Sequence, residues 1–306
     1  KGFPRGILVT PFIGGPRKRP AFQMLKQRVI TAIILLIVLV GSIYLSPLAF
    51  AAVMTFAVAA AIWEWLRMQG VKAALPVAAV MGIVLYALWV MGFRLRPQAL
   101  LALTAADAAV WFLLTVGLFR DRNTGFRLPV AAQGAMAVLM LPLAWYSILW
   151  LFEIGSWQMV ISVLAIVWSA DICAYFCGRF FGGKIFGDMK MAPAISPKKT
   201  WEGALGAYIL GLCVLFAIGI ACAGRADVFQ SVLITETGFL TAVVVTLLLT
   251  LFSMAGDLLE SAAKRQAGIK DSSNLLPGHG GWFDRLDSCV PVMPAVVLII
   301  LLTTIS

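Results

Sequence analysis

The stretch FLTAVVVTLLLTLFSMAGDLLE (Phe239–Glu260), followed directly by SAAKRQAGIKDSSNLLPGHGGWFDRLD (Ser261–Asp287), decides the fold. Its first part is apolar over the roughly 20 residues that a helix needs to cross a bilayer. Its second part gathers ionisable side chains, glycines and helix breakers more densely than any other part of the chain. This order predicts a membrane helix that ends in a functional polar loop.

The composition of the whole chain also indicates a membrane protein. The 306 residues are 61% hydrophobic and 12% charged, and the mean hydropathy is +0.96. Soluble domains are about half apolar and roughly a quarter charged. The net charge of +10 could suggest a nucleic-acid partner, but the basic residues lie between apolar spans, so we predict none. Cys173 and Cys177 lie four apart on one apolar span, which favours packing over a metal site or redox pair.

Apolar length and the positions of proline and glycine predict an all-α, polytopic fold with about nine transmembrane helices. We interpret residues 1–23 as a non-native or disordered leader, because they show no helical period and no signal-peptide pattern. The expected spans are 29–45, 48–66, 74–93, 98–118, 129–150, 157–177, 202–223, 239–260 and 289–305.

The distribution of basic residues predicts the orientation of these spans. With a cytoplasmic N-terminus, the segments on that side hold 21 Lys and Arg residues and the opposite side holds 3. Cytoplasmic loops of membrane proteins carry an excess of Lys and Arg, so the active site should face the cytoplasm. We expect residues 24–150 to form a scaffold and residues 151–306 to form the catalytic region, with cytoplasmic loops 178–200 and 261–288.

The acidic residues around the polar loop suggest a metal–phosphate site. Asp257 and Glu260 share one helical face near the end of their span, and Asp284 and Asp287 lie three residues apart on a new turn. Hard oxygen ligands beside basic residues and an open glycine turn suit a divalent cation and phosphate. The alternative is an ion-paired interfacial loop. His279, the single histidine, is more typical of a turn than of a zinc site, since no second His or Cys stands at zinc spacing.

A second polar loop carries further candidates. Asp171, Tyr175 and Arg179 follow one face of their span, and the loop then continues into SPKKTWEG (Ser196–Gly203). Its glycines and paired lysines could cradle phosphate at a helix start, although an ordinary basic loop explains them equally well. Thr200 is a natural N-cap for the next helix, and Glu202 in its first turn suits the helix dipole.

Two other acidic residues lie within the early spans. Glu64 has Arg67 three residues further on and could simply pair with it at the membrane interface. Asp107 lies mid-span among alanines and could make a helix–helix hydrogen bond. Neither residue is assigned a role from the sequence.

The polar segment resembles the signature of the phosphatidate cytidylyltransferase family, bacterial type. The likeness extends upstream through the Asp171–Arg179 segment and SPKKTWEG to the opening LKQRVITA, and it covers Met24 to the end of the chain. Ala263 departs from it, since larger apolar residues are common there. The matching signature residues are Ser261, Lys264–Arg265, Lys270–Asp271, Pro277–Gly281, Asp284–Arg285 and Asp287.

The resemblance implies transfer of a cytidylyl group from CTP to phosphatidate, with release of pyrophosphate. It further implies a multi-pass protein of the bacterial inner membrane, a homodimer, and Mg²⁺ with the option of a second ion. We expect Asp257, Asp284 and Asp287 to bind metal. Lys264 and Arg265 complete the expected catalytic group. The residues expected to bind substrate are Asp171, Arg179, Ser196, Lys198, Lys199, Ser261, His279 and Arg285.

Two rival functions fit the sequence less well. A secondary transporter predicts an inverted internal repeat, and the chain shows no such repeat. A CDP-alcohol phosphotransferase needs an Asp-x-x-Asp-Gly core, but Ser288 follows Asp287 here. A purely structural membrane protein would not need the segment 261–287.

Overall fold

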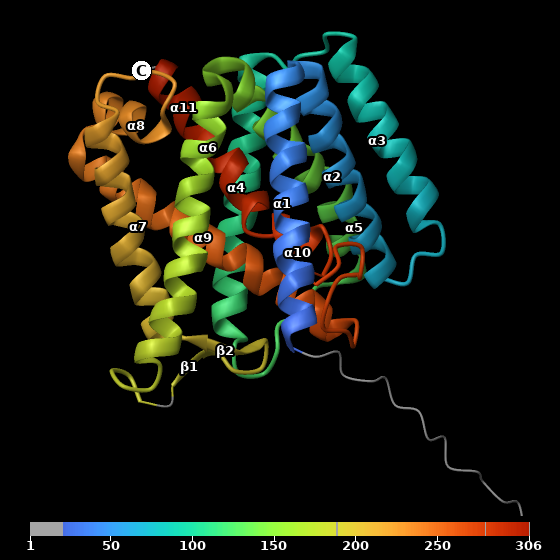
Figure 1. Cartoon of the computed structure of the whole chain (residues 1–306), viewed down its shortest axis with the longest axis vertical. Helices are drawn as coiled ribbons and strands as arrows, with labels where there is room; N and C mark the ends of the chain where they lie inside the picture. Colours follow the sequence, from blue (N-terminus) through green and yellow to red (C-terminus); the bar gives the residue numbers. More distant parts are fainter. Residues whose placement is uncertain (1–20, 188, 279, 306) are drawn as a thin grey trace, which may run out of the picture.

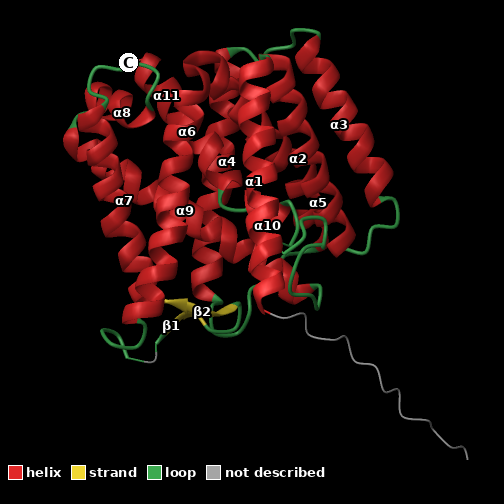
Figure 2. Cartoon of the chain, viewed as in Figure 1, coloured by secondary structure: helices red, strands yellow, loops and turns green. Residues whose placement is uncertain are grey.

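The computed structural model describes residues 21–187, 189–278 and 280–305, and the regular secondary structure of this part of the chain is helical apart from one small hairpin (Figures 1 and 2). The predicted all-α class is thereby confirmed. The helices are α1 (Ala21–Leu45), α2 (Pro47–Met68), α3 (Ala74–Val90), α4 (Pro97–Arg120), α5 (Val130–Ala135), the π-helix η1 (Met136–Met140), α6 (Leu141–Phe181), α7 (Trp201–Ala221), α8 (Phe229–Thr237), α9 (Phe239–Gln266), α10 (Phe283–Leu286) and α11 (Cys289–Ile305).

Every predicted span coincides with a helix. Among the described residues, six helices are long and apolar enough to cross a membrane, and two shorter apolar helices cover 29–45 and 74–90. One of the six, Val130–Phe181, contains two predicted spans. Its backbone leaves helical geometry at Gly155 and Ser156, where Ser156 has a φ of +56°. The count of nine and the orientation of the N-terminus stay predictions.

Local sequence signals explain several helix boundaries. Ser46 caps α2 by accepting a hydrogen bond from the Ala49 amide at 3.0 Å, and Pro47 occupies the first turn. Pro97 likewise occupies the first turn of α4. Helix α1 begins at Ala21, while residues 1–20 of the predicted leader lie outside the described part of the chain.

The hairpin is an element that the sequence did not predict. Strands β1 (Lys190–Ala192) and β2 (Ser196–Thr200) pair antiparallel, with Lys190 opposite Thr200 and Ala192 opposite Ser196. Thr200 then caps α7 by accepting from the Gly203 amide at 3.1 Å, as expected. The hairpin therefore fixes the lysines of β2 immediately before the start of a long helix.

Helices α6 and α7 make the most extensive contact in the bundle, and small residues allow it. A Cβ atom added at Gly203 would lie 2.7 Å from the carbonyl oxygen of Ala174. One added at Gly206 would clash with the thiol of Cys177, which confirms a packing role for that cysteine. The close contact brings the end of α6 beside the start of α7.

The two polar loops lie toward the same end of the molecule. In Figure 1 the β hairpin and the segment between α9 and α10 occupy the lower part of the view, while the C-terminus lies at the top. Helix α9 connects α8 to the segment that precedes α10. Helix α11 packs against α4, α6 and α9. This arrangement lets residues from both loops meet at one site.

Candidate active site

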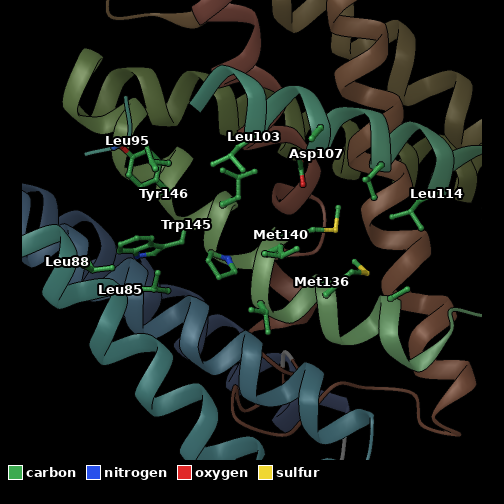
Figure 3. Close-up of a pocket in the computed structure, with 18 of the residues that line it drawn as sticks. Leu85, Leu88, Leu95, Leu103, Asp107, Leu114, Met136, Met140, Trp145 and Tyr146 are labelled. Carbon is green, nitrogen blue, oxygen red and sulfur yellow. The ribbon is translucent and has the colours of Figure 1, made fainter. Parts of the chain in front are cut away.

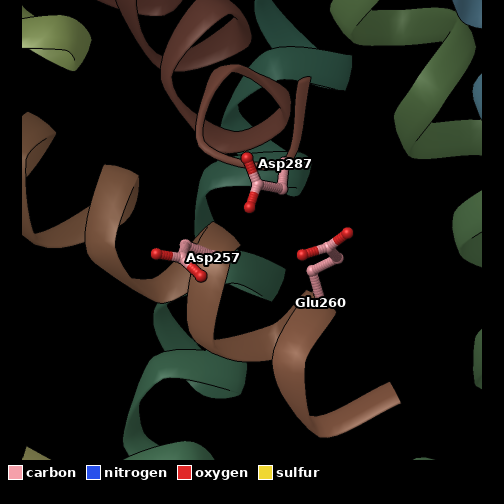
Figure 4. Close-up of side chains that lie close together, drawn as sticks. All are labelled: Asp257, Glu260 and Asp287. Carbon is pink, nitrogen blue, oxygen red and sulfur yellow. The ribbon is translucent and has the colours of Figure 1, made fainter. Parts of the chain in front are cut away.

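Three carboxylates from two elements converge at the lower end of α9. Asp257 and Glu260 project from α9, and Asp287 follows α10 (Figure 4). One oxygen from each lies within 4.8 Å of the others. Like charges at this spacing destabilise one another, and most strongly where burial removes water. A divalent cation that shares these oxygens would relieve the repulsion.

A glycine beside Asp257 makes this convergence possible. A Cβ atom added at Gly256 would lie 2.3 Å from the backbone oxygen of Asp287. The two backbone segments are therefore so close that only glycine fits at position 256. The Ser288 amide donates to Asp287 Oδ1 at 2.8 Å and fixes the direction of that carboxylate. The sequence AGD in α9 therefore positions Asp287 as well as Asp257.

The residues present fit a metal such as Mg²⁺. All three candidate ligands supply hard oxygen atoms, which Mg²⁺ and Ca²⁺ prefer. Glu260 is 2% exposed, and its Oε1 atom is buried without a hydrogen-bond partner in the described part of the chain. A buried acceptor without a partner is costly, and a cation at this position would satisfy it.

Lys264 connects this cluster to a different carboxylate. Its ammonium group donates to Glu260 and, at 2.5 Å, to Asp284 Oδ1. Asp284 Oδ2 accepts from the Gly281 amide at 2.7 Å and from the Ser272 hydroxyl at 2.8 Å. Asp284 therefore borders the three-carboxylate cluster, because it interacts directly with Glu260 and shares Lys264 with it.

All three predicted metal ligands lie in or beside this cluster. The structure brings Asp257 and Asp287 together with Glu260, and Asp284 adjoins this group through Glu260 and Lys264. The sequence placed Glu260 on the correct helical face without naming it as a ligand. What it could not show is that Lys264 reaches both Glu260 and Asp284. Which carboxylates bind metal stays a prediction.

Glu64 of α2 holds the glycine turn that precedes α10. Its carboxylate accepts from the amides of Trp282 at 3.0 Å and Phe283 at 2.7 Å and from the hydroxyl of Ser273, while the Ser272 hydroxyl that donates to Asp284 lies 3.0 Å from Glu64 Oε2. Its side chain is fully buried. The alternative considered for Glu64 was a pair with Arg67. In the structure Arg67 instead donates to the backbone oxygen of Ser272 at 2.5 Å, so both residues contact the loop.

A basic cavity of about 390 Å³ opens beside the carboxylate cluster. Lys199 joins the two, because its ammonium group lies 2.7 Å from Asp257 Oδ2. Arg179 donates to the Tyr175 hydroxyl at 3.1 Å, in agreement with the prediction that both residues lie on one face of the helix. The predicted site residues that line the cavity are Asp171, Arg179, Lys198, Lys199 and Asp257.

The other predicted site residues lie around this cavity and cluster. Arg265 reaches the backbone oxygens of Ile195 and Ile269 and so connects α9 to the hairpin. The Ser261 hydroxyl lies 3.5 Å from Asp257 Oδ1, and Arg285 interacts electrostatically with Asp171. Ser196 begins β2. His279 lies outside the described residues.

Glu202 has a role that its position in the helix did not reveal. Its Oε1 atom accepts from the amides of Gly183, Ile185 and Phe186 at 2.9, 3.4 and 3.1 Å. These amides are therefore occupied from within the chain, so this glycine segment is not a free phosphate cradle. Lys198 and Lys199, which line the cavity, are the better candidates for binding phosphate.

Comparisons with known proteins identify the family. The sequence matches the profile of the family described as the cytidylyltransferase family over residues 26–303. It is 35% identical over 280 residues to the phosphatidate cytidylyltransferase of Pseudomonas aeruginosa, with 89% of this chain and 95% of the relative covered. The enzymes of the same name from Haemophilus influenzae and Bacillus subtilis are 33% and 29% identical, with 89% and 91% of this chain and 96% and 98% of the relatives covered.

The match extends over both polar loops and the early helices, and it agrees with the motifs that suggested the resemblance. The chain therefore belongs to the cytidylyltransferase family.

Proposed function

We propose that this protein transfers a cytidylyl group from CTP to phosphatidate, giving CDP-diacylglycerol and pyrophosphate for phospholipid synthesis. The names of the relatives support this reaction. The observation that carries the proposal is the Lys199–Asp257 contact, which joins a basic cavity to a cluster of carboxylates. Such a pair of neighbouring sites suits one substrate rich in phosphate and one metal ion.

The proposed reaction needs charge neutralisation more than proton transfer. A phosphate oxygen of phosphatidate attacks the α-phosphorus of CTP, the bond from that phosphorus to the β-phosphate oxygen breaks, and pyrophosphate leaves. A phosphate monoester is largely dianionic near neutral pH, so no strong general base is required. Catalysis then depends on holding two anions in line and on stabilising the charge that develops.

The residues of the site divide this work. Lys198, Lys199 and Arg179 would bind the triphosphate in the basic cavity. When bound by Asp257, Glu260 and Asp287, Mg²⁺ would neutralise phosphate oxygens, and a second ion could assist pyrophosphate departure. Lys264 would hold Glu260 in place for that role.

Location and assembly belong to the same proposal. The excess of Lys and Arg in segments at one end supports an active site on the cytoplasmic side of the bacterial inner membrane. CTP would arrive from that side, while phosphatidate would enter sideways from the inner leaflet. A homodimer, which the resemblance implies, stays a prediction.

An activity assay on detergent-purified protein tests the reaction. Phosphatidate and labelled CTP should give CDP-lipid and pyrophosphate in the presence of Mg²⁺ and not after chelation. Asp257→Asn should lower the rate at least about tenfold, because it removes both a candidate ligand and the partner of Lys199. Asp121→Asn, which alters an exposed pair with Arg120, serves as the matched control. Folded wild-type protein that forms no product from CTP with phosphatidate would contradict the proposal.

A further inference from the structure

A second large cavity lies away from the basic one. It encloses about 480 Å³ between α3, α4, the α5–η1 segment and the start of α6 (Figure 3). Its size is that of a pocket for a small organic molecule, about 300–1,000 Å³. Helix α3 packs mainly on α2 and stands at the edge of the molecule in Figure 1, so the cavity separates α3 from α4. The walls are almost entirely apolar.

One acidic side chain interrupts these apolar walls. Asp107 of α4 is 7% exposed, and its Oδ2 atom finds no hydrogen-bond partner among the described residues. Figure 3 shows its carboxyl group pointing into the space that the lining side chains enclose. A buried acceptor without a partner is unfavourable, and in a membrane span an ionisable residue marks a functional site by default.

The polar groups at the other end of the cavity are already paired. Arg94 lies over the ring of Trp89 at 3.5 Å and forms a salt bridge with Glu153. The Tyr146 hydroxyl accepts from the Leu95 amide at 2.9 Å. These contacts satisfy the polar groups at that end, and the carboxyl group of Asp107 stays available as an acceptor for a ligand.

The cavity also borders the carboxylate cluster. Met136 and Met140 of η1 line it on one side, and on their other side they line a small void beside Glu260 and Asp287. A π-helical turn is rare and frequently lies at a functional site, and methionine adapts its shape to its neighbours. A molecule in the cavity would therefore pack on the same two side chains that cover the cluster.

We propose that this cavity binds a neutral lipid that carries a free hydroxyl group, with its chain between α3 and α4 and its hydroxyl donating to Asp107. The lining contains no Lys or Arg among the described residues, so a phosphate headgroup would face an acidic side chain without a compensating cation. The site is thus distinct from the basic cavity proposed for the triphosphate of CTP. It does not depend on the cytidylyl-transfer proposal.

Quenching of tryptophan fluorescence tests this site, because Trp89 and Trp145 line it. The probes are a brominated long-chain alcohol and the methyl ether of the same chain length, which accepts but does not donate a hydrogen bond. In purified protein, the alcohol should quench saturably and bind at least about fivefold more tightly than the ether. Trp89→Phe should remove a large part of the saturable signal and so locate the probe.

Variants at Asp107 distinguish binding through the hydrogen bond to Asp107 from non-specific apolar binding of the probe in the cavity. Asp107→Leu should reduce the alcohol's affinity to that of the ether, whereas Asp107→Asn keeps a carbonyl acceptor and should retain part of the preference. Equal binding of alcohol and ether by the wild type would overturn the proposal and indicate bulk lipid. Quenching that appears only when a dimer dissociates would also overturn it, because a second copy of the chain would then fill the cavity.

Discussion

Glu64 shows how a residue far away in sequence can organise the candidate site. It lies on α2, more than 200 residues before the loop that it holds. Three donors converge on its carboxylate, and two of them are backbone amides at the start of α10. Gly281 is required for this contact, because an added Cβ would lie 2.4 Å from Glu64 Oε2. No local pattern in the sequence pairs these two positions, so the sequence left Glu64 unassigned.

Glu64→Gln should weaken the hold of α2 on the loop before α10. Its amide group would face the N–H groups of Trp282 and Phe283 and could not accept both hydrogen bonds. We expect the rate of CDP-lipid formation to fall at least about tenfold, as when partners that support metal ligands are lost. The exposed Glu153→Gln, at the other end of the bundle, is the control. Equal rates in the two variants would refute this role for Glu64.

At the scale of elements, apolar length and helix breakers were sufficient to predict the long helices, but not the short helix α8. Each predicted span coincides with a helix because a chain in a bilayer must satisfy its own backbone hydrogen bonds. The hairpin was missed because β2 reads SPKKT, which lacks alternating apolar residues. It is supported by its neighbours, including a hydrogen bond from the Ala194 amide to the Arg122 carbonyl oxygen at 3.1 Å.

Short elements also limited the prediction of the site. The spacing of Asp284 and Asp287 suggested that both carboxylates share one side of a turn. Helix α10 ends at Leu286, and the two side chains have different neighbours. Lys264 and Ser272 hold Asp284, Asp257 lies beside Asp287, and Glu260 lies beside both carboxylates. Spacing alone cannot predict these partners, because tertiary contacts decide them.

Gly256→Ala tests the close approach of α9 to the segment after α10. The added methyl group would lie 2.3 Å from the Asp287 backbone oxygen, so either α9 or the backbone at Asp287 has to move. Because a displacement of about 1 Å can cost about 100-fold in rate, we expect a loss of that size in the activity assay. Gly41→Ala, where no atom lies within 4 Å of the added methyl, should leave the rate unchanged. Wild-type activity in Gly256→Ala would show that the approach is not needed.

On the scale of the whole molecule, the candidate site is assembled from distant parts of the chain. The early helices contribute Glu64 and Arg67, the hairpin region contributes Lys199, and α9 with the final loop contributes the carboxylates. The sequence predicted that loops 178–200 and 261–288 would meet, since alternation of the spans places them on one side. It did not predict that α2 would hold the second loop, because long-range side-chain contacts leave no periodic signal.

Binding of Mn²⁺, used as a paramagnetic substitute for Mg²⁺, tests the central claim most directly. Electron paramagnetic resonance of the purified protein should show a bound ion that Mg²⁺ displaces. Its affinity should fall at least about tenfold in Asp257→Asn, Glu260→Gln and Asp287→Asn, and should be unchanged in Asp121→Asn. Wild-type affinity in all three carboxylate variants would contradict the claim that these residues hold the metal on which cytidylyl transfer depends.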